Sequence, residues 1–186
     1  MILTTERLML RPWWDDDWER MAEISGDPEV MHWLMGPQTR DESDRAMARM
    51  LVQSMQDGFG PWAVEAPRVS PLVGRVGGRR VAEGLPCAPC VELVWRIGRP
   101  WQGQGYATEA ARAAVADLFE VHAVPEVIAV TAVGNAASRR VMEKLGMTHD
   151  PAEDFDHPKV PEGHELRRHV LYRLKRPAGG RIVWPR

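Results

Sequence analysis

The stretch Glu92-Leu-Val-Trp-Arg-Ile-Gly-Arg-Pro-Trp-Gln-Gly-Gln-Gly-Tyr-Ala-Thr-Glu-Ala-Ala-Arg-Ala-Ala-Val-Ala116 decides the fold of this chain. Its first part alternates as a half-buried strand does, with apolar Val91, Leu93, Trp95 and Ile97 on one side. Beyond two glycines the period changes, and small or apolar side chains recur at helical spacing from Ala107 to Phe119. The sequence therefore predicts a strand, a glycine turn and a helix that packs closely on a sheet.

The turn between strand and helix contains Gly103 and Gly105. Because glycine has no Cβ, the backbone can turn sharply there and bring its N–H groups against a ligand. The first N–H groups of a helix have no partner within the helix, and the helix dipole favours an anion beside them. The turn thus predicts a phosphate or pyrophosphate site, although a tight connection that binds nothing would use the same glycines.

Two other phosphate loops fit this turn badly. A Walker loop ends in Gly-Lys-Ser or Gly-Lys-Thr, and the turn contains no lysine. A dinucleotide fingerprint needs Gly or Ala three residues after its second glycine, where this chain has Thr108.

Composition limits the classes of protein that the chain can represent. With 186 residues, 44% of them hydrophobic, it is long enough for one globular domain, which we expect over residues 1–176, followed by a loosely ordered tail at 177–186. The net charge of −2 and the lack of a basic block argue against nucleic acid or an anionic membrane as partner. No apolar run has the length of a membrane span, and no signal-peptide core follows Met1, so we expect a cytoplasmic protein.

The two cysteines, Cys87 and Cys90, do not predict a metal or redox site. Zinc would need further ligands at suitable spacing, and a redox Cys-x-x-Cys opens a helix, whereas this pair precedes a strand. We expect two reduced thiols in a loop and no metal.

The rest of the chain gives a mixed order of elements. An apolar run at 127–130 is typical of a strand buried on both faces, and it follows the central strand and helix, which predicts a parallel pair with a right-handed crossover. The expected helices are 15–26, 28–34, 40–56 and 136–145; the expected further strands are 6–11, 62–65, 72–76, 147–149 and 169–174; and the expected loops are 77–89 and 150–165.

The order Gln102-x-x-Gly105-x-Ala107 resembles the acyl-CoA loop of the GNAT acetyltransferase superfamily. The fuller run from Gly103 to Ala110 is similar to the branch that contains the bacterial ribosomal-protein N-terminal, or Rim-type, acetyltransferases. Further similarity lies in Thr5-Glu6-Arg7-Leu8-x-Leu10-Arg11, in Asp27-Pro28-Glu29-Val30, and in Asn135-x-x-Ser138-x-x-Val141-Met142-Glu143-Lys144-Leu145-Gly146-Met147. The resemblance implies an α/β protein of the α+β type with the GNAT fold: a mixed, mostly antiparallel central sheet with one parallel, splayed strand pair and helices on both faces.

The resemblance also implies acetyl-CoA as co-substrate. It places the pyrophosphate at the amides of the glycine turn and the pantetheine along residues 93–97, with the amide near Val94 facing the thioester oxygen. This branch often has glycine at position 94, so Val94 leaves less room there. The implied acetyl-CoA contacts are Leu93, Val94, Trp95, Arg96, Ile97, Gln102, Gly103, Gln104, Gly105, Tyr106, Ala107, Thr108, Asn135 and Ser138.

Glu92 is the first candidate for chemistry. It lies in a central strand on the face opposite Leu93, where an unpaired carboxylate would be costly. It is either a general base that deprotonates the amine through water, or the partner of a salt bridge to Arg96 on the same face.

Asn135 and Ser138 are the second pair of candidates. Asn135 suits the N-cap of the following helix, and Ser138 could simply be a small residue of its first turn. The resemblance favours function for both, with Asn135 beside the pantetheine and the Ser138 hydroxyl near the sulfur. Tyr106 could protonate the thiolate instead, but its place in the turn indicates packing.

These features together predict an N-acetyltransferase that uses acetyl-CoA. The acceptor is a primary amine, either a peptide N-terminus or a small molecule, and the oligomeric state is open between a monomer and a homodimer. Rival interpretations are a non-catalytic acyl-CoA sensor and a dinucleotide-dependent enzyme. By resemblance, a mouth for a cationic acceptor is formed by Trp13, Trp14, Trp18, Trp33 and Met35 together with Glu153, Asp154 and Asp156.

Overall fold

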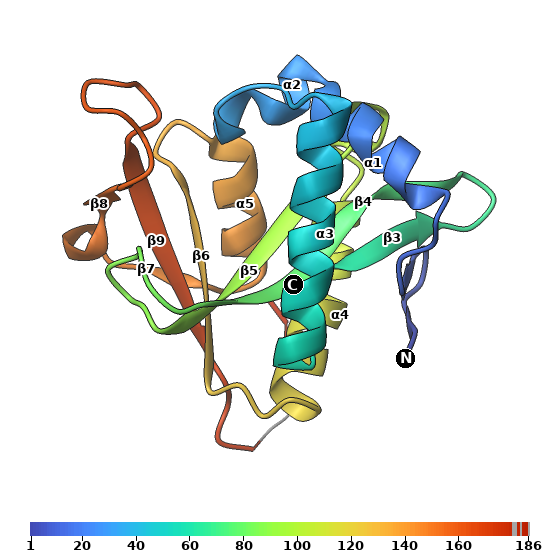
Figure 1. Ribbon diagram of the computed structural model, residues 1–186. Coiled ribbons are helices and arrows are strands. Elements are labelled where there is room, and N and C mark those ends of the chain that lie inside the picture. Colours follow the sequence, from blue (N-terminus) through green and yellow to red (C-terminus); the bar gives the residue numbers. More distant parts are fainter. Residues whose placement is uncertain (180–181, 183, 186) are drawn as a thin grey trace.

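The computed structural model describes residues 1–179, 182, 184 and 185, and in this part of the chain one mixed sheet of nine strands forms the centre of the molecule (Figure 1). The strands follow the order β1-β2-β3-β4-β5-β6-β9-β7, with β8 paired to β9. They are β1 (Leu3–Thr4), β2 (Met9–Arg11), β3 (Trp62–Ala66), β4 (Ser70–Val81), β5 (Cys90–Ile97), β6 (Glu126–Ala132), β7 (Thr148–His149), β8 (Phe155–Asp156) and β9 (Arg168–Lys175).

Helices cover both faces of this sheet (Figure 1). They are α1 (Asp17–Gly26), α2 (Pro28–Met31), α3 (Arg40–Asp57), α4 (Tyr106–Glu120) and α5 (Ala136–Lys144), with short 3₁₀ turns η1 (His32–Leu34), η2 (Arg99–Trp101) and η3 (Pro151–Glu153). The predicted starts of α2 and α3 are confirmed by their caps: Asp27 accepts from the N–H of Glu29, and Thr39 forms a capping box with Glu42. None of the helices in the described residues is both long and apolar enough to cross a membrane.

The predicted unit of strand, glycine turn, helix and parallel strand is confirmed as β5, α4 and β6. The antiparallel ladder of β4 with β5 runs without interruption from Gly74 opposite Ile97 to Val81 opposite Cys90. The parallel ladder of β5 with β6 has a single register pair, Glu92 opposite Ile128. The two parallel strands therefore diverge after Glu92, which is the splayed pair that the resemblance implied.

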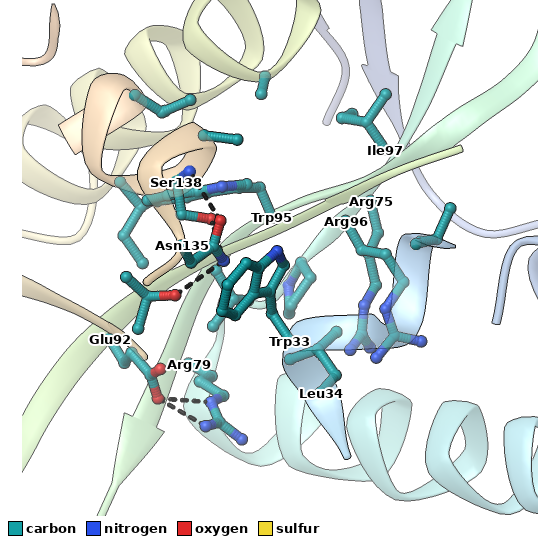
Figure 2. A pocket seen from close by; sticks show the side chains of 18 of the residues that line it. Trp33, Leu34, Arg75, Arg79, Glu92, Trp95, Arg96, Ile97, Asn135 and Ser138 are labelled. Atoms are coloured by element: carbon teal, nitrogen blue, oxygen red, sulfur yellow. Dashed lines mark hydrogen bonds and ion pairs between the residues drawn. The ribbon is translucent and has the colours of Figure 1, made fainter. Parts of the chain in front are cut away.

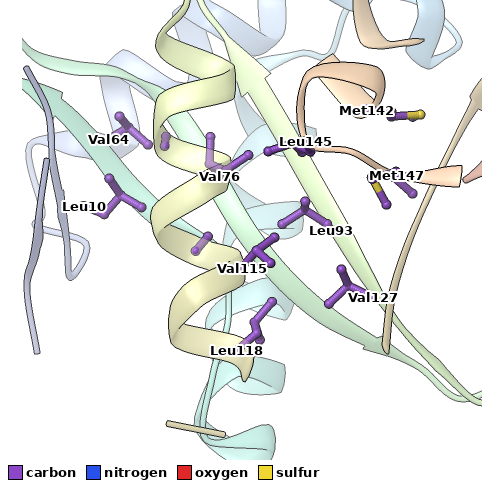
Figure 3. Packing of buried hydrophobic residues seen from close by; sticks show 14 of the residues in the cluster. Leu10, Val64, Val76, Leu93, Val115, Leu118, Val127, Met142, Leu145 and Met147 are labelled. Atoms are coloured by element: carbon purple, nitrogen blue, oxygen red, sulfur yellow. The ribbon is translucent and has the colours of Figure 1, made fainter. Parts of the chain in front are cut away.

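The main core lies between α4 and the sheet (Figure 3). Small side chains on α4 bring the helix close to the strands: Ala110, Ala111 and Ala114 are at most 1% exposed. A Cβ at Gly78 of β4 would lie 2.7 Å from Leu118 Cδ1, so glycine is needed for this approach. A second cluster beneath α1 and α3 contains Met21, Ile24, Val30, Met47, Ala63 and Leu72.

The predicted loop at 77–89 is wrong in its first part, because β4 continues to Val81. Gly77 and Gly78 are strand residues. Their lack of a side chain allows other segments to pack closely against the strand and does not mark a turn. A Cβ on Gly77 would lie 2.6 Å from the carbonyl oxygen of Gly60 and from the Cα of Pro61. The loop that remains carries Cys87, whereas Cys90 is the first residue of β5; both thiols are free, and their sulfurs are 3.4 Å apart.

Smaller corrections concern the edges of the sheet. The predicted strand at 6–11 begins only at Met9, as β2, because the N–H of Thr5 donates to the carbonyl of Leu8 in a turn. The short strand β1, at Leu3–Thr4, precedes this turn and was not predicted. The predicted loop at 150–165 contains β8. The tail predicted at 177–186 includes positions 180, 181, 183 and 186, which lie outside the described residues, whereas Ile182 and Trp184 pack against the main core.

Candidate active site

A cleft of about 890 Å³ opens beside β5 (Figure 2). One side of it is formed by the glycine turn, the start of α4, β6 and α5; the other by η1, α3 and β4. The implied acetyl-CoA contacts that line this cleft are Leu93, Val94, Trp95, Arg96, Ile97, Gln102, Gly103, Gly105, Tyr106, Ala107, Thr108, Asn135 and Ser138, together with Glu92. Gln104 is not among the lining residues. Segments distant in the sequence therefore meet at one site.

The glycine turn has the backbone that an anion site needs. Gly103 and Gly105 have φ angles of 73° and 85°, a region that side chains disfavour. The first backbone bond of α4 runs from the N–H of Glu109 to the carbonyl of Gly105 at 3.0 Å. The N–H groups just before Glu109 consequently have no acceptor within the helix and can bind phosphate oxygens.

Side chains hold this turn in place from both ends. Gln102 donates from Nε2 to the carbonyl of Ile97 at 2.9 Å, which ties the turn to the end of β5. Gln104 donates to the carbonyl of Pro100 at 2.9 Å and so supports the turn from outside the cleft. Arg7 donates to the carbonyl of Gln104 at 2.9 Å.

Glu109 in α4 connects the N-terminal segment to the turn. Its carboxylate pairs with Arg7 at 2.7 Å and accepts a hydrogen bond from the Thr5 hydroxyl at 2.6 Å. Burial raises the pKa of Glu109, but the bonds from Thr5 and Arg7 outweigh it and hold the pKa below its usual value. The Arg7 guanidinium also covers the ring of Tyr106, which is 6% exposed, so Tyr106 packs as expected.

On the opposite side, one face of β4 and β5 contributes Arg75, Arg79, Glu92, Val94 and Arg96, which we call the β4–β5 face. Glu92 is 5% exposed and accepts from Arg79 Nε at 2.9 Å and Arg79 Nη2 at 2.6 Å (Figure 2). Of the two alternatives for Glu92, the salt bridge to Arg96 is wrong, because the partner is Arg79. Arg79 lies directly opposite Glu92 in the ladder, where side chains approach more closely than those of residues four apart along one strand.

Asn135 caps α5 and binds Ser138 at the same time. Asn135 Oδ1 accepts from the N–H of Ser138 at 3.2 Å, while Nδ2 donates to the Ser138 hydroxyl at 3.1 Å and to Thr131 Oγ1 at 2.9 Å. Asn135 is 7% exposed, so this amide is fixed from three directions. The Ser138 oxygen acts as acceptor here, and its own proton stays available for a group in the cleft.

Sequence reasoning missed Arg75 and Arg79 as site residues, and also Met50 of α3. Arg79 falls in the part of β4 that was predicted as a loop, whereas Arg75 lies in the predicted strand at 72–76. Alternation along a strand would have placed Arg75 and Arg79 on one face, so the signal was present once the strand was known.

The acidic mouth expected from the late loop does not line the cleft. Glu153 pairs with Arg173 at 2.6 Å, Asp154 with His149 at 2.7 Å, and Asp156 with Arg168 at 3.4 Å. These carboxylates are therefore each paired within their own part of the fold. Of the apolar side chains expected at the mouth, Trp33 lines the cleft, whereas Trp13 and Trp18 pack beneath α1.

Neither a metal nor a reactive thiol is indicated near this cleft. In the described residues, no group of three or more His, Cys, Asp or Glu side chains is placed to hold a metal ion. Burial raises the pKa of the Cys90 thiol to about 12, and the hydrogen bond with Cys87 acts in the same direction. Cys90 is accordingly protonated at neutral pH and is no nucleophile.

Comparison with known proteins agrees with this geometry. Residues 7–148 match the family described as Acetyltransferase (GNAT) domain. The chain is 30% identical over 200 residues to FsC-acetyl coenzyme A-N(2)-transacetylase of Aspergillus fumigatus, covering 98% of this chain and 83% of that protein. It is 27% identical to a Bacillus subtilis protein named uncharacterized N-acetyltransferase YnaD, covering 94% of this chain and 96% of the relative.

Solved structures give the same result. An acetyltransferase (GNAT family) from Bacillus anthracis superposes with a TM-score of 0.77 at 26% identity, covering 94% of this chain and 98% of that one. RimL, a ribosomal L7/L12 alpha-N-protein acetyltransferase in complex with coenzyme A, superposes with a TM-score of 0.75 over 94% of this chain and 98% of that one; at 12% identity it shows the shared fold alone. The chain therefore belongs to the GNAT family and is an acetyl-CoA-dependent N-acetyltransferase.

Proposed function

We propose that this enzyme acetylates a primary amine that reaches the thioester of acetyl-CoA from the β4–β5 face. The observation that carries the proposal is the convergence on one cleft of the glycine turn, the Asn135–Ser138 pair and the buried Glu92. The glycine turn follows the carboxyl end of β5, whereas Glu92 lies near the start of the same strand (Figure 2). Pantetheine along β5 would carry the thioester from the turn toward Glu92.

Each of these groups has a task in the transfer. A bond forms between the amine nitrogen and the acetyl carbonyl carbon, and the bond from that carbon to sulfur breaks. The amine loses a proton and the sulfur gains one. In our proposal Ser138 donates to the sulfur, Glu92 accepts the amine proton through water, and the N–H near Val94 donates to the carbonyl oxygen.

The bonds around Ser138 support its part in this scheme. Asn135 already donates to the Ser138 oxygen, so the hydroxyl proton points elsewhere. Glu92 has a competing role as the partner of Arg79, and this pair by itself explains why a carboxylate is tolerated in the strand. The role of Glu92 as base is therefore tested by kinetic measurements.

Two classes of acceptor fit a cleft of this size, a peptide α-amine and a small-molecule amine. The name of the Aspergillus relative assigns transfer to an N(2) atom, and that of RimL assigns an α-amine of a ribosomal protein. The sequence similarity to the Aspergillus protein covers nearly the whole chain, whereas the likeness to RimL shows the fold alone, so acceptors of both classes are examined.

A panel of amines with labelled acetyl-CoA tests the proposal. Peptides with free N-termini, amino acids and polyamines would each be mixed with the protein, and both free CoA and labelled amide would be measured. Stoichiometric formation of the two with at least one amine is the expected result. Tight acetyl-CoA binding with no transfer to any amine would instead favour a sensor, and a melting temperature raised by NAD would favour a dinucleotide enzyme.

A further inference from the structure

Arg75 of β4 and Arg96 of β5 face each other across the antiparallel ladder. Both side chains line the cleft, and their guanidinium groups lie side by side in it (Figure 2). Directly opposed like charges destabilise a sheet, and the effect grows when water is excluded. A pair of this kind costs stability unless an anion compensates the two charges.

Within the described part of the chain, neither Arg75 nor Arg96 forms a salt bridge with a carboxylate; Glu92 acts on Arg75 only from a greater distance. The polar contact of the Arg75 side chain is a bond from Nη1 to Met50 Sδ at 3.1 Å, and that of Arg96 is a bond from Nη1 to Ser25 Oγ at 2.7 Å. Arg96 Nε is buried without any partner. Both partners are neutral, so the two positive charges remain unbalanced and one donor is unused.

The pKa values of both groups respond to this environment. Burial, followed by the charge of Arg79, lowers the pKa of Arg75 to about 10, although Glu92 opposes the effect. Burial, followed by the charge of Arg75, lowers the pKa of Arg96 to about 9. Both groups are still charged at neutral pH, but at a cost that a bound anion would remove.

The next cross-strand pair on the same face provides an internal comparison. Arg79 lies opposite Glu92, and the two form an ion pair at 2.6 Å. The same two strands thus neutralise one arginine with a carboxylate and set the other against a second arginine. Between these pairs lies Val94 opposite Gly77, where our proposed function puts the thioester.

We infer that Arg75 and Arg96 bind a carboxylate of the acceptor, so that the natural substrate is an amine that also carries an acid group. The inference rests on the proposed function for the position of the amine. Arginine forks match the two oxygens of a carboxylate, and both guanidinium groups line the cleft. Val94 and Arg96 are two residues apart on one face, roughly 7 Å along the strand, which sets the span between the reacting amine and the acid.

Matched pairs of amines test the inference. The acids glycine, β-alanine, γ-aminobutyrate and δ-aminovalerate would be compared with their amides. Peptide amides that begin with Asp would be compared with those that begin with Asn. For the unaltered enzyme we expect KM to be at least tenfold lower for the better acids than for their amides, with an optimum chain length. A preference confined to the peptides would locate the carboxylate on a side chain.

Arg75→Gln and Arg96→Gln should remove this preference, because the KM of each acid should rise to that of its amide. Arg45→Gln, an exposed arginine of α3 outside the cleft, is the control and should leave the preference intact. Because each change relieves repulsion between two cations, Tm should stay constant or rise. If the role of these arginines were only structural, their replacement would lower Tm.

Binding to the CoA-loaded protein separates this inference from the proposed function. If no amine is acetylated, the proposed function fails, and calorimetry with γ-aminobutyrate and its amide still tests the anion site through Arg96→Gln. Tighter binding of the acid, lost in that variant, supports the inference with or without turnover. Equal KM and equal affinity for acid and amide in the unaltered enzyme would overturn the inference. An equal loss of affinity for the acid and the amide in the arginine variants would overturn it as well.

Discussion

The side-chain amide of Asn135 donates to the hydroxyl oxygen of Ser138 at 3.1 Å while its carbonyl oxygen accepts from the Ser138 backbone at 3.2 Å. One residue therefore caps α5 and orients the hydroxyl at the same time. The cap depends on the Ser138 backbone, whereas the proposed chemistry depends on the Ser138 side chain. The two roles can be separated by mutation.

Ser138→Ala removes the hydroxyl and keeps the N–H that Asn135 accepts. We expect kcat to fall by perhaps 10²-fold with little change in the affinity for acetyl-CoA, because only protonation of the leaving sulfur is lost. Steady-state kinetics and calorimetry on the same preparation measure both quantities. An unchanged kcat would assign Ser138 to helix capping alone.

Glu92→Gln distinguishes a general base from a structural ion pair. A base matters most where the amine is protonated, and with amine pKa values of ~8 to ~10 we expect the loss of rate to be largest at low pH. Arg79→Gln is the matched control, since it breaks the same ion pair and leaves the carboxylate in place. If both variants share the pH–rate profile of the unaltered enzyme, Glu92 has no part in proton transfer.

The ion pair of Arg11 with Asp17 should be a major determinant of stability. Their side chains are 0% and 2% exposed and meet in two bonds of 2.7 and 3.0 Å. Asp17→Asn removes the more buried of the two carboxylates that pair with Arg11 and leaves Glu65 at 2.7 Å, so the free energy of unfolding should fall by about 1.5–3 kcal/mol. Asp41→Asn, which breaks an exposed pair with Arg45, should change it little in the same urea titration.

His157 and His169 predict how stability depends on pH. Burial lowers the pKa of both, and repulsion from His169 lowers that of His157 further. The folded protein therefore favours the neutral rings, and their contribution to stability is complete above the unfolded pKa of about 6.5 and is lost as the pH falls below it. Urea titrations should show His157→Gln weakening this dependence, whereas exposed His32→Gln should not.

Much of the fold could be predicted from the sequence because local signals agreed. The glycine turn, the alanine face of α4 and the capping box at Thr39 each depend on neighbours within a few residues. The strand at Gly77 was missed because glycine there reflects contact with Gly60 and Pro61, which are distant in the sequence. Local patterns cannot distinguish a glycine that turns from one that packs.

Parts of the site were beyond sequence reasoning for a related reason. The partner of Glu92 follows from the register of β4 on β5, and that register is fixed by the whole ladder rather than by either strand. Arg96 lies on the same face of the same strand, four residues from Glu92, and thus appeared to be the natural partner, although Arg79 lies directly opposite. That Arg75 and Arg96 face each other also follows only from the register of β4 on β5.

The most direct test of the central claim is the affinity for acetyl-CoA after a change in the glycine turn. Gly105→Val adds a side chain at a φ of 85°, where phosphate must approach, and we expect at least tenfold weaker binding, about 1.4 kcal/mol, by calorimetry. Gly84→Val is the control, because it introduces nearly the same backbone strain, at a φ of 86°, in an exposed loop. The Gly84→Val protein should bind acetyl-CoA with the affinity of the unaltered protein. Equal affinity in a folded Gly105→Val protein would contradict the claim that this turn binds the pyrophosphate.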